Sequence, residues 1–220
     1  MTKNGTVSSK TLAWKGLKWL VKAYSGSPGG NRYVLPNVFI DVNNQLHLIV
    51  QKDAVGWTCA SLQTTTKMKY GTYRAVVQGR LDLLDKNVIF GMFNYGGVDY
   101  INEIDIEVAY WGDPSYGPIG YTSYPPTIKN KVFNEAFPIK QLSNMTTHKF
   151  TWLSDGVVFL SQQGEKASGD NSESIASCHT STSPNVAMPF YFDLWLMDHK
   201  APSNNLPTEV VIKDFSFTPL

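Results

Sequence analysis

The chain has 220 residues, of which 42% are hydrophobic, 13% aromatic and only 17% charged, and its formal net charge is +1. This composition excludes a disordered chain, and the scattered basic residues do not form the stripe that binds nucleic acid. No apolar run approaches the roughly 18 residues that a membrane-spanning helix requires. We therefore expect a single domain over residues 1–220, a monomer whose partner is a neutral ligand rather than nucleic acid or a membrane.

The β-rich segments are short and are separated by Gly, Pro, Asn and Asp, and none keeps apolar residues at helical spacing. Residues 37–42 and 45–50 flank an Asn-Asn turn, which predicts a β-hairpin. Further strands are predicted at residues 71–78, 87–94, 103–108, 148–153, 157–160, 189–195 and 210–217. We interpret this spacing as an all-β fold, a jelly-roll sandwich of two antiparallel sheets.

Two segments between the predicted strands have loop composition. Residues 25–30 are rich in Gly, Ser and Pro and predict a surface loop, and residues 164–184 are rich in Ser, Thr and charge and predict a long loop. The two cysteines, Cys59 and Cys178, lack the spacing of a zinc site. We favour two free thiols, and a disulfide stays open because the sequence does not give the distance between the sulfurs.

The segment around residue 105 alternates acidic and aliphatic residues. On a β-strand, Glu103, Asp105 and Glu107 would share one face and the aliphatic residues between them the other. One interpretation is a solvated face whose acids pair with Lys or Arg. Residues 87–128 contain no Lys or Arg, however, so local partners are scarce. Unpaired like charges at such distances raise one another's pKa.

The alternative interpretation of this strand is glycoside hydrolysis. That reaction needs one carboxylic acid to protonate the leaving oxygen and one carboxylate to attack the sugar or activate water. The Cα atoms of Glu103 and Glu107 would lie roughly 13 Å apart on a straight strand. The two side chains must therefore lean together over Asp105 to reach the separation of roughly 5 to 5.5 Å that a retaining pair requires.

The Glu-x-Asp-x-Glu pattern resembles the active-site signature of glycoside hydrolase family 16. Further resemblances to that family lie at residues 57–60, 70–73, 90–95, 148–156, 191–195 and 212–215, in the family's order. The resemblance covers nearly the whole chain and implies a jelly roll with a concave substrate cleft. It also implies hydrolysis that retains the anomeric configuration, with Glu103 as nucleophile, Glu107 as acid/base and Asp105 between them, and no cofactor in the reaction.

The uninterrupted spacing of the three acids resembles the lichenase and xyloglucan-transglycosylase branch of the family. It implies an endo-acting enzyme on a β-1,3-1,4-glucan or β-1,3-glucan, with an extracellular or periplasmic location, although the given chain shows no signal peptide. Where lichenases carry a Glu and an Arg, this chain has Ser61 and Gln63. Its contacts with the sugar must therefore differ from those of a lichenase.

Several other residues fall at positions that imply substrate binding. Trp195, Tyr95 and Phe93 resemble the family's sugar-stacking aromatics, Trp111, Tyr121 and Tyr124 follow the motif where rim loops are expected, and Asn31 could bond a sugar hydroxyl. For each aromatic the alternative is core packing, and for the asparagine it is turn chemistry. Asp214 resembles a ligand of the structural calcium ion found in many family members.

Two other functions are compatible with a β-sandwich. A lectin or carbohydrate-binding module would share the fold but would have no chemical need for three intact acids. A transglycosylase would use the same acids, and a sugar hydroxyl rather than water would intercept the glycosyl-enzyme intermediate. The sequence does not identify the acceptor residues that separate transfer from hydrolysis.

Overall fold

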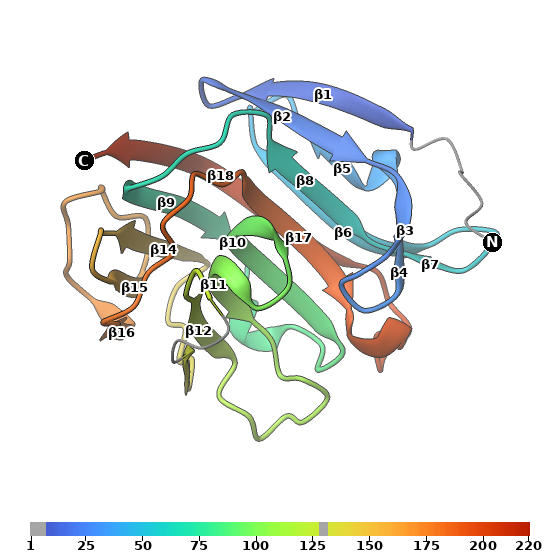
Figure 1. The fold of residues 1–220 in the computed structure, drawn as a ribbon. Coiled ribbons are helices and arrows are strands. Elements are labelled where there is room, and N and C mark those ends of the chain that lie inside the picture. The colour runs from blue at the N-terminus through green and yellow to red at the C-terminus, as the bar shows by residue number, and fades with distance from the viewer. Residues whose placement is uncertain (1–7, 128–131) are drawn as a thin grey trace.

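Two antiparallel β-sheets pack face to face in the computed structural model, which describes residues 8–127 and 132–220 (Figure 1). From edge to edge, the first sheet contains β1 (Ser9–Trp14), β2 (Leu17–Lys22), β8 (Ala60–Thr64), β17 (Phe190–Leu196), β10 (Val88–Val98), β11 (Ile101–Val108), β12 (Ile119–Tyr124) and β13 (Phe133–Phe137). The second sheet contains β16 (Ser174–His179), β15 (Val157–Gln163), β14 (Met145–Trp152), β9 (Gly71–Gln78), β18 (Thr208–Pro219), β6 (Leu46–Lys52) and β5 (Val38–Ile40), with β7 (Trp57–Thr58) paired to β6.

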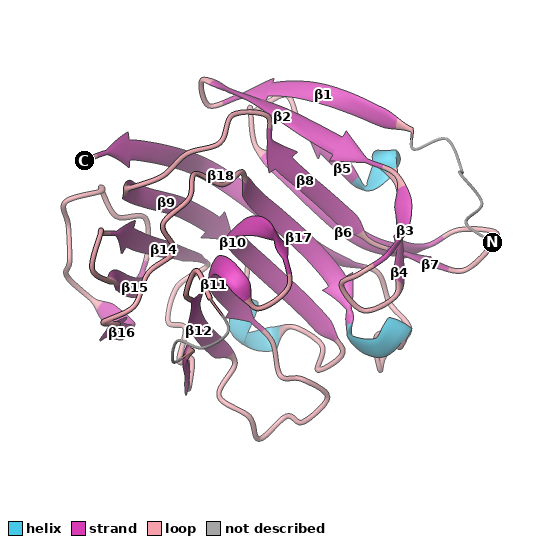
Figure 2. Ribbon diagram, viewed as in Figure 1, coloured by secondary structure: helices cyan, strands magenta, loops and turns pink. Residues whose placement is uncertain are grey.

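The remaining elements are small (Figure 2). Strands β3 (Tyr24–Gly26) and β4 (Asn31–Tyr33) form a two-stranded ribbon, and the 3-10 helices are η1 (Leu35–Asn37), η2 (Leu81–Leu83) and η3 (Met197–His199). Among the described residues, no helix has the length and apolar character needed to cross a bilayer. The all-β jelly-roll architecture predicted from the sequence is therefore confirmed.

Every predicted strand overlaps a strand of the structure, and the segment at residues 71–78 coincides with β9. The predicted hairpin is present, since β5 pairs antiparallel with β6. The predicted long loop at residues 164–184 is wrong in its middle, because β16 lies there and pairs antiparallel with β15. This edge strand is made mostly of small and polar residues, so its extended form comes from pairing rather than from local propensity.

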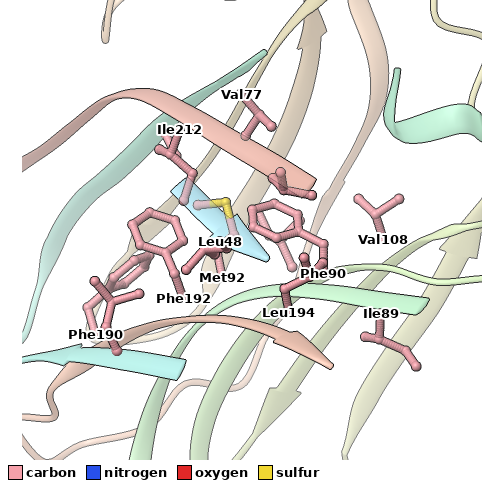
Figure 3. Packing of buried hydrophobic residues seen from close by; sticks show 14 of the residues in the cluster. Leu48, Val77, Ile89, Phe90, Met92, Val108, Phe190, Phe192, Leu194 and Ile212 are labelled. Carbon is pink, nitrogen blue, oxygen red and sulfur yellow. The ribbon is translucent and has the colours of Figure 1, made fainter. Parts of the chain in front are cut away.

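The core between the sheets is built from alternate positions of neighbouring strands. Phe190, Phe192 and Leu194 of β17, with Phe90 and Met92 of β10, are each at most 1% exposed (Figure 3). Burial of each such side chain contributes roughly 1.5–3 kcal/mol. Because side chains alternate along a strand, the residues between these point to the opposite, open face of the first sheet.

The two cysteines are free thiols, as predicted. Cys59 is buried beside β8 of the first sheet, whereas Cys178 is partly buried on β16 at the edge of the second. Burial raises the pKa of both thiols to about 12. Both side chains are therefore uncharged and packed as small apolar groups.

Candidate active site

The acidic strand predicted from the sequence is β11, which lies between β10 and β12 in the first sheet. Ile104 and Ile106 point into the core and are 0% and 1% exposed. The side chains of Glu103, Asp105 and Glu107 lie on the open face of the sheet, where all three line one cleft. The apolar face of the strand thus anchors it, and its acidic face lines the cleft.

Strand register places aromatic residues beside the first two acids. Glu103 lies opposite Tyr95 of β10 and Tyr124 of β12, and Asp105 lies opposite Phe93 of β10. Residues directly opposite one another in an antiparallel pair share a face of the sheet. The aromatic rings therefore flank the carboxyl groups in the cleft instead of packing into the core.

A second row of cleft residues runs through Glu107. Gly91 of β10 lies opposite Glu107 on one side and opposite Asp193 of β17 on the other, and Asp193 in turn lies opposite Ser61 of β8. All of these positions share the open face of the sheet. The row therefore brings a fourth carboxyl group, that of Asp193, into the same cleft.

The cleft has a volume of about 580 Å³ and crosses the first sheet from β2 to β12. It is lined by Leu20, Lys22, Tyr24, Ser27, Pro28, Ser61, Gln63, Phe93, Tyr95, Asp99, Tyr100, Glu103, Asp105, Glu107, Tyr124, Tyr191, Asp193 and Trp195. Five strand spacings separate β2 from β12, which gives a length of roughly 24 Å. The site is therefore an extended groove lined by aromatic and polar side chains.

Burial is the main cause that raises the pKa of Glu103, Asp105 and Glu107. The neighbouring carboxyl groups raise these pKa values further. A hydrogen bond between Asp105 and Glu103 acts in opposite directions, since it raises the pKa of Asp105 and lowers that of Glu103. This hydrogen bond therefore favours the neutral form of Asp105, as donor, and the ionised form of Glu103, as acceptor.

This arrangement separates the protonation states of the three groups. Glu103 is the easiest of the three to ionise, because it accepts hydrogen bonds from Asp105 and from the Tyr100 backbone. For Glu107 no such donor is found among the described residues, and burial beside Glu103 and Asp193 favours its neutral form. These causes favour ionisation of Glu103 over ionisation of Glu107, which is the kind of difference that acid/base chemistry uses.

The backbone is strained at both ends of β11. Tyr100, Asn102 and Trp111 all have positive φ angles, of 65°, 52° and 51°. Residues other than glycine rarely adopt this left-handed region, and each costs of order 1–3 kcal/mol. Such strain is concentrated at functional sites in proteins, where the surrounding fold holds residues in one defined geometry.

Most of the predicted substrate-binding aromatics lie in the cleft. Trp195, Tyr95, Phe93 and Tyr124 line it. The ring of Phe93 is stacked on that of Tyr191 at a centroid distance of 4.9 Å, which makes a broad apolar shelf beside the acids. The predicted stacking surface is therefore extended by Tyr191, which the sequence analysis did not single out.

Trp111 lies against a second, smaller hollow rather than in the main cleft. This hollow has a volume of about 230 Å³ and is lined by Glu107, Trp111, Tyr116, Gly120, Thr122 and Asn134. Trp111 packs edge-on against Trp195, with 6.0 Å between the ring centroids. Glu107 lines both the cleft and this hollow and therefore stands at the boundary between them.

The predicted contact of Tyr121 with substrate is wrong, because its side chain lies in the core. Tyr121 is 0% exposed, stacks on Phe159 and donates a hydrogen bond to Ser161 Oγ at 2.7 Å. It lies opposite Ile106, so it shares the inward face of the sheet. Side chains alternate between the two faces along β12, and Tyr121 falls on the face that points into the core. Its place shortly after the motif did not reveal this, which explains the error.

Asn31 does not reach a ligand either, because its amide is used within the fold. Its side chain is 0% exposed and donates to the carbonyls of Leu196, at 2.7 Å, and Pro28, at 3.1 Å. Asn31 Oδ1 lies 3.2 Å from His199 Nδ1. The predicted sugar contact is therefore replaced by a structural role that ties the β3–β4 ribbon to the end of β17.

Asp214 is surrounded by cations and is unsuited to a calcium ion. Its two carboxylate oxygens lie 3.1 Å from Lys15 Nζ and 2.8 Å from Arg74 Nη1. These partners lower the pKa of Asp214 and would repel a divalent cation. No group of three or more metal-ligating side chains occurs within residues 8–127 and 132–220. The residues at this position do not fit the predicted calcium site.

Sequence reasoning missed Asp193 as a member of the site. The only signal was its place in the 190–195 segment, where it alternates with Phe192 and Leu194 of the core. This alternation places Asp193 on the open face of the sheet. Only the pairing of β17 with β10 shows that it lies in the same row as Glu107. Ser61 and Gln63, noted as departures from lichenases, also line the cleft.

No protein-family model and no curated protein sequence matches the chain, whereas solved structures do. A Bacillus licheniformis β-glucanase aligns over 99% of this chain and 100% of its own, at 14% identity and a TM-score of 0.70. A prokaryotic β-1,3-1,4-glucanase (lichenase) derived from a mouse hindgut metagenome aligns over 98% and 100%, at 14% identity and a TM-score of 0.69. This chain shares their fold.

A third similar structure is a Bacteroides ovatus mixed-linkage glucan protein of glycoside hydrolase family 16, in complex with product. It aligns over 91% of this chain and 94% of its own, at 12% identity and a TM-score of 0.65. At these identities the likeness is one of architecture. What this chain does must therefore be argued from its own cleft.

Proposed function

We propose that this protein is a retaining, endo-acting hydrolase of glycoside hydrolase family 16 that cleaves a β-linked glucan. The observation that carries the proposal is the set of three carboxyl groups of β11 in one cleft, with burial and hydrogen bonds that separate their protonation states. Paired carboxyl groups of unequal pKa are the requirement of glycoside hydrolysis.

In the proposed reaction, Glu103 attacks the anomeric carbon while Glu107 donates its proton to the leaving glycosidic oxygen. A covalent glycosyl-enzyme results, and Glu107, now ionised, removes a proton from the water that hydrolyses it. The Asp105 carboxyl keeps its proton and donates a hydrogen bond to Glu103. This bond stabilises the carboxylate form of Glu103 before attack and again after the intermediate is released.

The shape of the cleft supports a polysaccharide rather than a single sugar. The groove is open at the surface of the first sheet and spans roughly 24 Å, several sugar rings in length. Aromatic rings such as Phe93, Tyr191 and Trp195 offer apolar faces to pyranose rings. The β-glucanases among the similar structures favour a β-1,3-1,4-glucan or β-1,3-glucan as substrate, and we propose an extracellular or periplasmic location for such an enzyme.

The test is a substrate screen with barley mixed-linkage glucan, lichenan, laminarin, xyloglucan, agarose and carrageenan, with products read as reducing ends and by mass. We expect β-glucan hydrolysis by the native protein and a loss of about 10³-fold or more in Glu103→Gln. Glu135→Gln is the matched control, since Glu135 is exposed on β13 of the same sheet and outside the cleft.

Sugar release that is undiminished in Glu103→Gln would refute the mechanism. Binding of oligosaccharides without turnover by the native protein would instead favour a lectin. Proton NMR of the first product tests retention separately, because an inverted anomer is incompatible with Glu103 as nucleophile.

Transglycosylation is a second candidate, favoured by the hollow beside Glu107. Trp111, Tyr116 and Asn134 line it and could hold an acceptor sugar next to the group that activates the incoming hydroxyl. Adding short acceptor oligosaccharides to the reaction and measuring product masses tests this candidate. Products longer than the donor fragment would indicate transfer, and their complete absence would leave hydrolysis alone.

A further inference from the structure

Asp193 is a carboxyl group of the cleft that the reaction proposed above does not use. It is 2% exposed, and among the described residues its Oδ1 accepts no hydrogen bond. Burial raises its pKa to about 7, and only the neighbouring Ser61 hydroxyl opposes that rise. A carboxylate in such a place is costly, because burial of an uncompensated charge is strongly unfavourable.

The groups around Asp193 supply no positive charge to hold it ionised. The charge of Asp193 raises the pKa of four nearby groups, Tyr24, Tyr33, Cys59 and Tyr191, none of which becomes cationic. Among the cleft-lining residues, the one Lys or Arg is Lys22 on β2, beyond Ser61 and β8. Asp193 is therefore tuned to gain and lose its proton near neutral pH.

The nearest carboxyl group across the sheet is that of Glu107. Two strand spacings separate the residues, roughly 10 Å between Cα atoms, and both side chains rise from the same face. The strand between them contributes Gly91, which has no side chain to fill the gap. A Cβ at that position would lie 3.9 Å from Glu107 Cγ. The ring of Phe93 leans over the same point, with its Cδ1 3.4 Å from that Cβ position, so the two acids lie on either side of Gly91 beside an apolar ring.

We propose that Asp193 is a positioning residue for the proton of Glu107: facing Glu107 across Gly91, it keeps that group in the acid form. The effect of Asp193 on the protonation of Glu107 does not depend on the proposed glycosidase function, whereas the role of that effect in catalysis rests on it. In that setting, ionisation of Asp193 opposes ionisation of Glu107 and extends the pH range in which the leaving oxygen can be protonated.

Other groups also face Glu107 and enter the same titration. Glu103 and Asp105 lie on its own strand, Tyr124 of β12 lies opposite Glu103 and has its pKa raised by all three acids, and Tyr116 shares the adjacent hollow. β10 contributes only Gly91 at this row. Asp193 is thus the single carboxyl group on another strand of the described structure that raises the pKa of Glu107, and it can be removed without changing β11.

The test is a ¹³C NMR titration of glutamate-labelled protein, with the Glu107 carboxyl signal assigned by its absence in Glu107→Gln. In Asp193→Asn, which is nearly isosteric, we expect the pKa of Glu107 to fall by roughly one unit. Asp198→Asn is the matched control, since Asp198 is exposed, lies outside the cleft and pairs with Lys200. It should leave the titration of Glu107 unchanged.

Two further variants separate charge from packing. Asp193→Ser is neutral but smaller and should lower the pKa of Glu107 in the same way, whereas Asp193→Glu restores a charge and should keep it raised. An unchanged Glu107 titration in both neutral variants would overturn the proposal. So would a fall of equal size in Asp193→Glu, because only packing would then explain it.

The pH profile of kcat/KM on β-glucan is the second readout, and we expect its alkaline limb to move to lower pH in Asp193→Asn. A shift of the Glu107 titration in a protein without glucanase activity would leave the coupling intact and remove the proposed function. Glucan hydrolysis by the native protein, together with an unchanged Glu107 titration in Asp193→Asn, would support the proposed function and overturn the coupling.

Discussion

The buried Asp193 carboxyl makes the stability of the fold depend on pH, and Asp193→Asn measures by how much. Its pKa rises from an ordinary 3.8 to about 7 on folding, mainly through burial. A raised folded-state pKa means that the folded protein binds the proton more tightly than the unfolded chain. The resulting stability is present below pH 4 and is lost as pH rises through about 7.

A shift of about three pKa units corresponds to roughly 4 kcal/mol, of which roughly 3 kcal/mol falls between pH 5 and pH 8. Asparagine has nearly the same shape as aspartate and cannot ionise. The free energy of unfolding of Asp193→Asn should therefore rise, relative to that of native protein, by roughly 3 kcal/mol between pH 5 and pH 8. The raised carboxyl groups other than Glu107 are common to both proteins and largely cancel, and the fall in the pKa of Glu107 proposed for Asp193→Asn would add to the rise in the same direction.

Guanidinium unfolding of native protein and Asp193→Asn at pH 5, 6, 7 and 8 provides the measurement, with Asp198→Asn as the surface control. A difference between native protein and Asp193→Asn that stays constant with pH would refute the reasoning, since it would mean that Asp193 is ionised, or neutral, throughout. A difference that grows toward low pH would show that Asp193 has a hidden cationic partner.

Three further predictions follow from the corrected residues. The Tyr121 hydroxyl forms hydrogen bonds only within the core, so Tyr121→Phe should lower the free energy of unfolding by about 1 kcal/mol and leave glucan turnover unchanged. A large rise in KM would contradict this placement of Tyr121. Gly29→Ala should lower the Tm far more than Gly30→Ala, since a Cβ on Gly29 would lie 2.4 Å from the Leu196 carbonyl and one on Gly30 meets nothing within 4 Å. Chelation by EDTA should leave the Tm unchanged, given the two cations that hold Asp214; a fall that added calcium reverses would be the opposing result.

The acidic strand could be predicted from the sequence because its information is local. Alternation of acids with isoleucine fixes which face is buried, whatever the strand pairs with. The faces of β12 could not be predicted in the same way. Tyr124 and Tyr121 both follow the motif, but the register pairs Tyr124 with Glu103 and Tyr121 with Ile106, so one faces the cleft and the other the core.

Asp193 lay beyond prediction for a different reason. It is far from Glu107 along the chain, and their meeting depends on β10 pairing with β11 on one side and β17 on the other. Such long-range pairing is set by the packing of whole sheets rather than by local sequence. The strand β16 was missed for the same reason, since pairing with β15 holds it extended.

The side-chain amide of Asn31 joins two parts of the groove. By bonding to the carbonyl of Leu196, it fastens the β3–β4 ribbon, whose turn supplies Ser27 and Pro28 to the cleft wall, to the strand that carries Trp195. The wall and that part of the floor are therefore connected by a buried hydrogen bond. Exchange of the 27–30 turn for longer or shorter sequences, with Asn31 retained, therefore offers a way to change the shape of the cleft wall while its attachment to the floor is kept.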